Sequence, residues 1–191
     1  CDWSSDVCSS DLSTLTAQQP ENDIVRVAIQ ALAAAAGGAQ SLHTNGFDEA
    51  LALPTERSAR IALRTQQILQ NEAGATDTAD PLGGSYYIEA LTSELVDAAR
   101  ELIGRVDERG GAVAAIESGF VKDEIESSAY RFQQEVESGA RIIVGVNGFV
   151  EESEERVELQ KIDPASEARQ VERTARVRAG RRSEEHTSEL Q

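Results

Sequence analysis

The chain has 191 residues, of which 40% are hydrophobic, so its length and composition suit a globular domain with an apolar core. Its formal net charge of -16 argues against nucleic-acid binding, because no basic run offsets the acidic residues. The longest apolar stretch, residues 25–39, contains Arg26 and Gln30 and is too short and too polar to cross a membrane. The start lacks the pattern of a signal or transit peptide, which predicts a cytoplasmic protein.

The two ends of the chain are related to each other at the level of DNA. One allowed coding of residues 182–191 is AGATCGGAAGAGCACACGTCTGAACTCCAG, and its reverse complement, read from the second base, encodes residues 3–11 as they stand. That DNA resembles a sequencing-library adapter, so residues 1–12 and 182–191 are predicted to be adapter-derived artefact, with a natural inverted repeat as the alternative. Resequencing the source locus is expected to replace both ends, and genomic reads running unbroken through them would contradict this.

The body between these ends, residues 13–181, carries few groups for catalysis by side chains. It contains no cysteine and no tryptophan, and its one histidine is His43. Thiol catalysis, a zinc site and a Ser-His-Asp triad therefore lack most of their components. The sequence predicts no catalytic residue and no metal ligand in this chain. Any reaction would therefore depend largely on a cofactor or on residues outside the chain.

Hydrophobic periodicity predicts a chain of helices. We expect helices over 22–36, 55–72, from 92 or 93 to about 107, 112–118, 121–138 and 164–178, each delimited by Gly, Pro or a capping residue. The first should bury Ile24, Val25, Ala28 and Leu32, and the second Ile61, Ile68 and Leu69. The N-cap of the first helix should be Asn22 or Asp23.

Three short strands are expected between these helices, at 39–45, 85–89 and 141–146. Strands separated by helices indicate βα units and a parallel sheet. Two or three strands cannot close a barrel or protect their own edges, so the body is expected to be the end of a larger α/β domain.

The first of these strands is unusually polar. A buried parallel strand normally consists of Val, Ile and Leu, whereas Gln40, Ser41, His43, Thr44 and Asn45 place polar groups on both faces here. Buried polar groups need hydrogen-bonding partners. Either one face lines a ligand-filled or water-filled interior, or the strand lies at the surface with its polar groups solvated.

Six runs of sequence carry a resemblance to a known family; in chain order they are 38–45, 48–51, 53–55, 58–62, 79–85 and 143–147. Together they resemble the closing part of the barrel in the methylmalonyl-CoA mutase family, large subunit, and they cover essentially the whole body but well under half of that subunit. The resemblance implies an α/β fold, namely the closing portion of a (β/α)8 TIM barrel at 13–150, followed by a helical linker at 151–181.

The same resemblance implies which residues meet ligands. Gln40 and Ser41 correspond to residues that contact the acyl-CoA substrate, and His43 of the same strand is either a further contact or a structural histidine. Glu49 and Ala50 correspond to the face that meets cobalamin, although Asp48 and Glu49 alone read equally well as surface carboxylates after a turn. A weaker candidate for a cobalamin contact, Gln133, lies in the fifth predicted helix.

The resemblance also implies an activity: an isomerase that rearranges a short branched acyl-CoA by radical chemistry with adenosylcobalamin. Its partners would be the acyl-CoA, a cobalamin-binding domain or small subunit, and a second subunit in a dimer or heterodimer. Which acyl-CoA is the substrate does not follow from these residues. The alternative is a non-enzymatic acidic helical adaptor, which leaves the polar strand unexplained.

Overall fold

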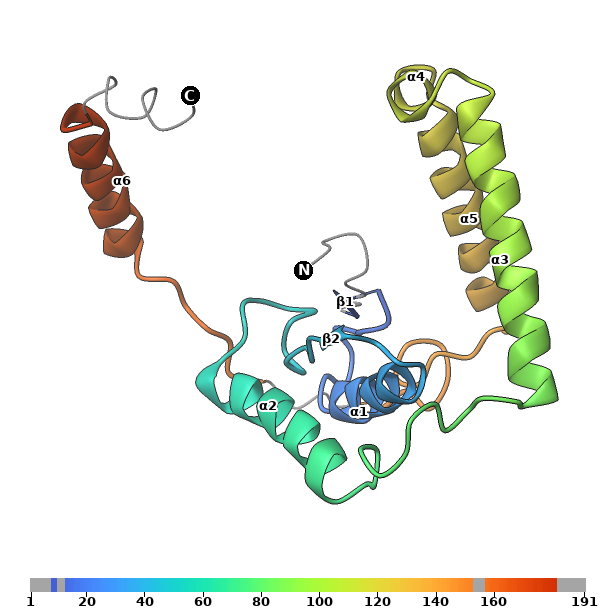
Figure 1. The fold of residues 1–191 in the computed structure, drawn as a ribbon. Coiled ribbons are helices and arrows are strands. Elements are labelled where there is room, and N and C mark those ends of the chain that lie inside the picture. The colour runs from blue at the N-terminus through green and yellow to red at the C-terminus, as the bar shows by residue number, and fades with distance from the viewer. Residues whose placement is uncertain (1–7, 10–12, 153–156, 182–191) are drawn as a thin grey trace.

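The computed structural model describes residues 8–9, 13–152 and 157–181 (Figure 1). Most of 1–12 and all of 182–191, the two predicted adapter segments, lie outside the described residues, as does 153–156 of the predicted linker. The described residues form mostly helices. The elements are β1 (Cys8–Ser9), α1 (Asn22–Ala36), β2 (Ser41–Leu42), α2 (Glu56–Asn71), α3 (Tyr86–Asp107), α4 (Ala112–Glu117), α5 (Phe120–Glu137) and α6 (Pro164–Ala179).

The main packing interface lies between α1 and α2. Small buried side chains, Ala31 on α1 and Ala62 on α2, together with Val27, form most of the apolar core. Alanine has no atoms beyond Cβ, so it allows two helices to approach closely. This pair carries β2 and the loop 43–54 that follows it (Figure 1).

The bounds predicted for α1 are confirmed, but the face predicted to be inward is wrong. The helix buries Asp23, Val27 and Ala31, while Val25 remains 59% exposed. The expected N-cap was also wrong, because the N-cap position is Glu21. The buried Asp23 accepts hydrogen bonds from Arg26 Nη1 at 2.6 Å and from the Thr16 N–H, so a charged side chain occupies the inward face where apolar residues were expected.

The helix α2 begins after Pro54, as predicted, with Thr55 as N-cap accepting from the Ser58 N–H at 3.3 Å. Its buried residues are Ser58, Ala62 and Thr65 instead of the predicted Ile61, Ile68 and Leu69. The side of α2 that faces the loop 43–54 is thus polar and small. Ile68 stays 49% exposed on the other side.

The only sheet in the described part of the chain is the parallel pair of β1 and β2, in which Cys8 is opposite Ser41 and Ser9 is opposite Leu42. The strand predicted at 39–45 is therefore confirmed in place but is much shorter. β1 falls within the range that the DNA relationship assigns to adapter sequence. Backbone pairing depends little on side-chain identity, so an arbitrary segment can occupy such an edge.

The segment 85–89 was predicted to be a strand and is instead the start of α3 at Tyr86. A strand needs a neighbour for its backbone groups, and no described strand lies beside it. The helix satisfies these groups internally, and the Glu89 carboxylate accepts from the Gly84 N–H at 3.0 Å just ahead of it. Local periodicity therefore determines the structure of this segment.

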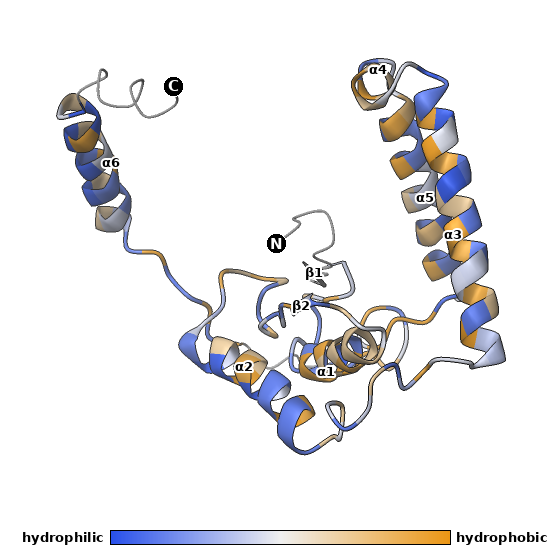
Figure 2. Cartoon of the chain, in the orientation of Figure 1, coloured by the Kyte–Doolittle hydropathy of each residue, from blue (hydrophilic) through white to orange (hydrophobic). Residues whose placement is uncertain are grey.

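The helices α3, α4 and α5 form an arm that projects away from the α1–α2 pair (Figure 1). The arm is closed at its tip by the buried Ala115 and by Arg105, which pairs with Glu124 and lies over the Phe120 ring at 4.9 Å. The predicted bounds of α4 and α5 are confirmed within one or two residues. Neither α3 nor α5 has a buried residue, and apolar side chains alternate with polar ones along both (Figure 2).

The predicted strand at 141–146 is wrong, because these residues form turns with a single bridge between Val144 and Gly148. The Asn147 side chain accepts from the Ile143 N–H at 2.7 Å and donates to the Val136 and Arg141 carbonyls, so it takes the place of a strand partner. Arg26 Nη2 of α1 donates to the Val144 carbonyl at 2.8 Å and holds this turn segment against the α1–α2 pair.

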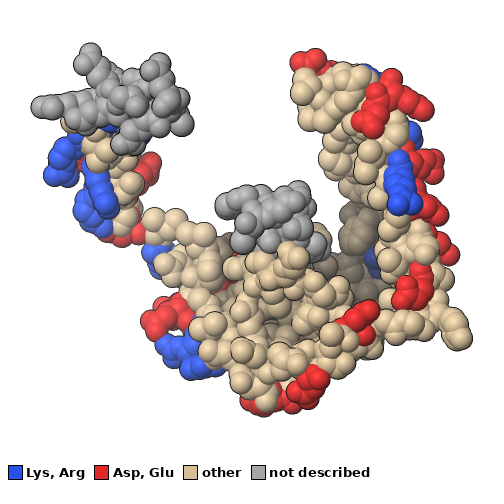
Figure 3. Space-filling model, viewed as in Figure 1, with Lys and Arg blue, Asp and Glu red and all other residues tan. Residues whose placement is uncertain are grey.

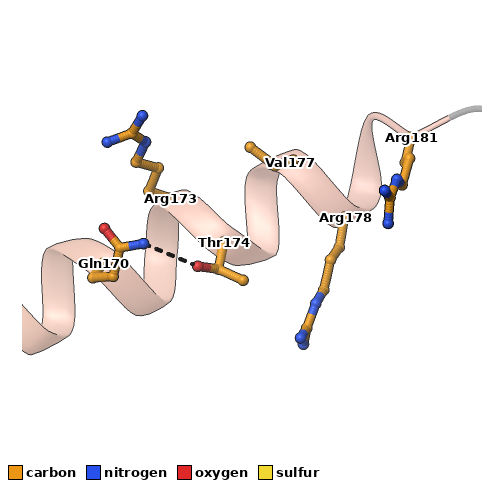
Figure 4. Close-up of a pocket in the computed structure, with 6 residues that line it drawn as sticks. All are labelled: Gln170, Arg173, Thr174, Val177, Arg178 and Arg181. Atoms are coloured by element: carbon orange, nitrogen blue, oxygen red, sulfur yellow. Dashed lines mark hydrogen bonds between the residues drawn. The ribbon is translucent and has the colours of Figure 1, made fainter. Parts of the chain in front are cut away.

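The helix α6 follows the linker with Asp163 as N-cap and Pro164 at its first turn, as predicted. No other element makes extensive contact with it. It carries a cluster of arginines, whereas acidic side chains predominate along the outer side of α3 (Figure 3). A groove on α6 lined by Gln170, Arg173, Thr174, Val177, Arg178 and Arg181 lies on this one helix alone, with Gln170 3.5 Å from Thr174 (Figure 4).

The accessible surface area of the chain, 15205 Å², is far larger than that of a compact protein of its mass of 20.6 kDa, for which about 8900 Å² is usual. The described residues are helix-rich and form no closed barrel, so the predicted barrel portion is not visible as such. None of the helices in the described ranges is long and apolar enough to pass through a membrane.

Candidate functional site

The three predicted substrate-binding residues lie together at β2. Gln40 precedes the strand, Ser41 is its first residue and His43 follows its last, and all three are exposed. The described strand beside β2 is β1, which falls in the predicted adapter range, so this pairing does not itself support a ligand-binding role. Contact with an acyl-CoA stays a prediction for each of them.

A small cavity of about 210 Å³ lies between the loop 43–54 and α2, and His43 and Glu49 both line it. Its other walls come largely from α2, through Ala62, Leu63 and Gln66. The cavity therefore joins one predicted substrate residue with one predicted cofactor residue. This geometry places the two predicted binding regions next to each other.

Thr44 connects the end of β2 to α2. Its hydroxyl donates to the Ala62 carbonyl at 2.8 Å and accepts from Gln66 Nε2 at 3.0 Å, and the side chain is only 6% exposed. Gln66 also donates to the Leu42 carbonyl at 3.3 Å. The strand end is thus held on α2 by side chains that the helix supplies.

The Glu49 carboxylate is used within the loop itself. It accepts from the Gly46 N–H and from Asn45 Nδ2, the latter at 3.0 Å, and the residue is half-buried. The structure therefore disagrees with the reading of Glu49 as a freely solvated surface carboxylate. Ala50 follows it at an exposed position with no bulk beyond Cβ.

Asp48 is fully buried, so its reading as a surface carboxylate is wrong. Its Oδ2 accepts from the Thr55 N–H at 3.0 Å and from the Thr55 hydroxyl at 2.8 Å. Burial on its own raises the pKa of Asp48, but the neighbouring Ser58 hydroxyl and the two Thr55 donors outweigh it and hold the pKa below its usual value. Asp48 is therefore ionised at neutral pH.

The Asp48 Oδ1 and Ser58 Oγ atoms are the two buried side-chain polar atoms of the described residues that lack a hydrogen bond of good geometry. Ser58 nevertheless lies close enough to Asp48 to lower its pKa. The loop 43–54 and the first turn of α2 are therefore in contact at the buried Asp48 carboxylate.

Asp23 is a second fully buried aspartate, located on α1 away from this loop. Burial raises its pKa above the usual value, and the hydrogen bonds from Arg26 and the Thr16 N–H only partly offset this. The same residue type is thus held with opposite pKa shifts at two places. The difference arises because the donors from Ser58 and Thr55 outweigh burial at Asp48, whereas the donors around Asp23 do not.

Gln133, the third predicted cobalamin-face residue, is not brought near Glu49 and Ala50. It lies exposed on α5 in the projecting arm, where its Nε2 donates to Glu137 at 2.7 Å (Figure 1). The structure thus places Glu49 beside the substrate candidate His43 and leaves Gln133 apart. No described residues form a cluster of three His, Cys, Asp or Glu side chains suited to a metal ion.

Sequence reasoning missed three buried polar residues of this site, Thr44, Asp48 and Ser58. The signal for Asp48 and Ser58 was present in part, because Thr55 directly after Pro54 marks a helix start, where an acidic side chain nearby is stabilising. What the pattern could not show is that the loop folds back seven residues so that Asp48 reaches Thr55.

The chain is similar in sequence to proteins of known function. Residues 6–191 match the family model described as methylmalonyl-CoA mutase. The large subunit of 2-hydroxyisobutanoyl-CoA mutase from Aquincola tertiaricarbonis is 47% identical over 91% of this chain, which covers 31% of that protein. The mitochondrial methylmalonyl-CoA mutase of Homo sapiens is 49% identical over 91% of this chain, which covers 23% of that protein.

A bacterial relative agrees with these two. Methylmalonyl-CoA mutase from Escherichia coli strain K12 is 49% identical over 82% of the chain, which covers 22% of that protein. The chain thus spans between 22% and 31% of the length of these three relatives. The resemblance inferred from the six sequence runs is confirmed: the chain belongs to the methylmalonyl-CoA mutase family.

Proposed function

We propose that this chain is the closing part of the (β/α)8 barrel of an adenosylcobalamin-dependent acyl-CoA mutase, acting on a short branched acyl-CoA of the methylmalonyl-CoA type. The observation that carries the proposal is that His43, which directly follows β2, lines one cavity together with Glu49 of the loop 43–54. Names of the relatives support it, since each is a CoA-ester mutase. Activity would require the remainder of the barrel.

Substrate binding is assigned to Gln40, Ser41 and His43. Their side chains offer amide, hydroxyl and imidazole groups along one exposed stretch, which suits the amide and thioester groups of a CoA arm. Gln66 and Thr44 hold the end of the strand, so the three residues would be presented by a fixed backbone.

Cofactor contact is assigned to Glu49 and Ala50, and the residues present fit a large flat group. Glu49 is restrained by two hydrogen bonds within its loop, and the small exposed Ala50 beside it leaves room for a broad ligand. When bound, adenosylcobalamin would supply the radical chemistry, while the chain binds and orients the substrate and excludes water. Gln133 would reach such a ligand only if the α3–α5 arm packed differently.

The remaining assignments rest on the family. The complete protein would work with a cobalamin-binding domain or small subunit, as a dimer or heterodimer. We retain the cytoplasm as the proposed location. A ligand-free adaptor would show no affinity for acyl-CoA or cobalamin, so the experiment below also tests that alternative.

Substituting Ser41 by leucine in the complete subunit is expected to raise the KM for the acyl-CoA about tenfold, which corresponds to roughly 1.4 kcal/mol. The branched apolar side chain would replace a hydroxyl at the exposed start of β2 and obstruct the CoA arm. Affinity for adenosylcobalamin should change little. Steady-state kinetics and a cobalamin titration measure the two effects separately.

Ser127→Leu is the matched control, because it makes the same change at an exposed position on the arm. It should leave both constants near their wild-type values. If Ser41→Leu folds and leaves the KM unchanged, the substrate assignment of β2 is wrong. If the wild-type complete subunit binds neither ligand, the proposed function itself is wrong.

A further inference from the structure

Asp48 is the point at which the loop 43–54 is attached to the start of α2. One of its carboxylate oxygens receives both donors of Thr55, and the Ser58 hydroxyl of the first helical turn is a further neighbour that lowers the pKa of Asp48. The side chain has no exposed surface. A buried charge held in this way restrains both segments that it joins.

The loop around Asp48 is closed on itself by its backbone. The Glu49 N–H donates to the Gly46 carbonyl at 3.1 Å, and the Leu51 and Ala52 N–H groups both donate to the Asp48 carbonyl, at 2.9 and 3.0 Å. The backbone of 46–52 therefore forms a hydrogen-bonded turn around Asp48. The residue that follows it directly is Glu49, whose carboxylate lines the cavity.

We propose that Asp48 is a positioning residue that sets the orientation of Glu49 toward the cobalamin face by anchoring the loop 45–52 on Thr55 and Ser58. The inference rests on the proposed function, which places Glu49 at that face. Asp48 itself would touch neither substrate nor cofactor.

The anchor is strongest with a carboxylate at this position. An asparagine oxygen could still accept both Thr55 donors, but it would lack the negative charge that strengthens these hydrogen bonds and would put an NH2 group in place of the second oxygen. The low pKa of Asp48 agrees with this, because the surrounding donors favour the ionised form. Thr55→Val gives a second, milder test, since it removes the hydroxyl donor and keeps the backbone N–H.

The test compares five variants of the complete mutase with its cobalamin domain: Asp48→Asn, Thr55→Val, Thr55→Ser, Glu49→Gln and Asp23→Asn. Asp23 is the matched control, because it is equally buried but anchors α1 instead of the loop. For each variant, adenosylcobalamin affinity is titrated by visible absorbance, acyl-CoA affinity by calorimetry, and stability by thermal unfolding.

We expect Asp48→Asn and Glu49→Gln to weaken adenosylcobalamin binding by a similar factor, roughly tenfold, as is common for second-layer partners of ligand-binding groups. Acyl-CoA affinity should change less than about twofold for both. Asp23→Asn should alter stability without altering cobalamin affinity. Thr55→Val should weaken adenosylcobalamin binding less than Asp48→Asn does. Thr55→Ser keeps the hydroxyl donor and should bind adenosylcobalamin as tightly as the wild type.

The outcomes distinguish failure of the positioning role of Asp48 from failure of the proposed cofactor face. If Glu49→Gln weakens cobalamin binding but Asp48→Asn has no more effect than Asp23→Asn, the positioning role is refuted and the proposed function stands. If Glu49→Gln has no effect, the cofactor face is wrongly assigned and the inference fails with it. Should Asp48→Asn not fold, unchanged cobalamin affinity in Thr55→Val would refute the positioning role.

Discussion

Expressed alone, residues 1–191 are expected to show no mutase turnover and no cooperative thermal transition. The described residues contain one parallel strand pair, and the helices leave large apolar side chains such as Leu95, Ile103 and Ile125 more than half exposed. Packing against other elements supplies most of the stability of helices in water, and the elements that would cover these faces are not present. A helical but loosely packed or aggregating species should result.

Circular dichroism during heating, together with sedimentation, measures this directly. The complete mutase subunit is the control and should unfold in a sharp transition that bound ligands shift upward. A soluble monomer of the isolated chain that melts in one sharp two-state transition would contradict the prediction. It would mean that the exposed faces need no further partner.

Ala31→Glu is expected to destabilise the complete subunit by about 3–5 kcal/mol, enough to abolish most folded protein, because it places an unpaired charge between α1 and α2. Ala31 is 2% exposed and lies on α1, whose main packing interface is with α2, so a carboxylate there would be removed from water. Soluble yield and denaturant unfolding give the measurement.

Ala33→Glu is the matched control, since it introduces the same side chain two positions away on an exposed part of the same helix. It should cost less than about 0.5 kcal/mol. Equal stability losses in the two variants would show that α1 packs with a different face in the complete protein. Equal tolerance would show that the α1–α2 interface is not part of its core.

Helix positions and the family could be predicted from local sequence alone. Hydrophobic periodicity, Pro54, Asp163 and the glycines after α1 and α5 locate four helix ends within one or two residues, because capping and backbone constraints act over a few neighbours. The polar composition of 40–45 predicted a strand that faces either a ligand or solvent. Its first part is exposed in the structure, whereas Thr44 and Asn45 are buried and hydrogen-bonded.

Strands and inward faces were decided by tertiary structure. The segments 85–89 and 141–146 have strand-like composition, but a strand exists only where a partner pairs its backbone, and here a helix and an Asn147 turn satisfy those groups instead. The burial and ionisation of Asp48 likewise depend on residues that only the tertiary structure brings to it. Asp48 is ionised and buried only because Thr55 and Ser58 are folded against it, and sequence spacing does not encode that contact.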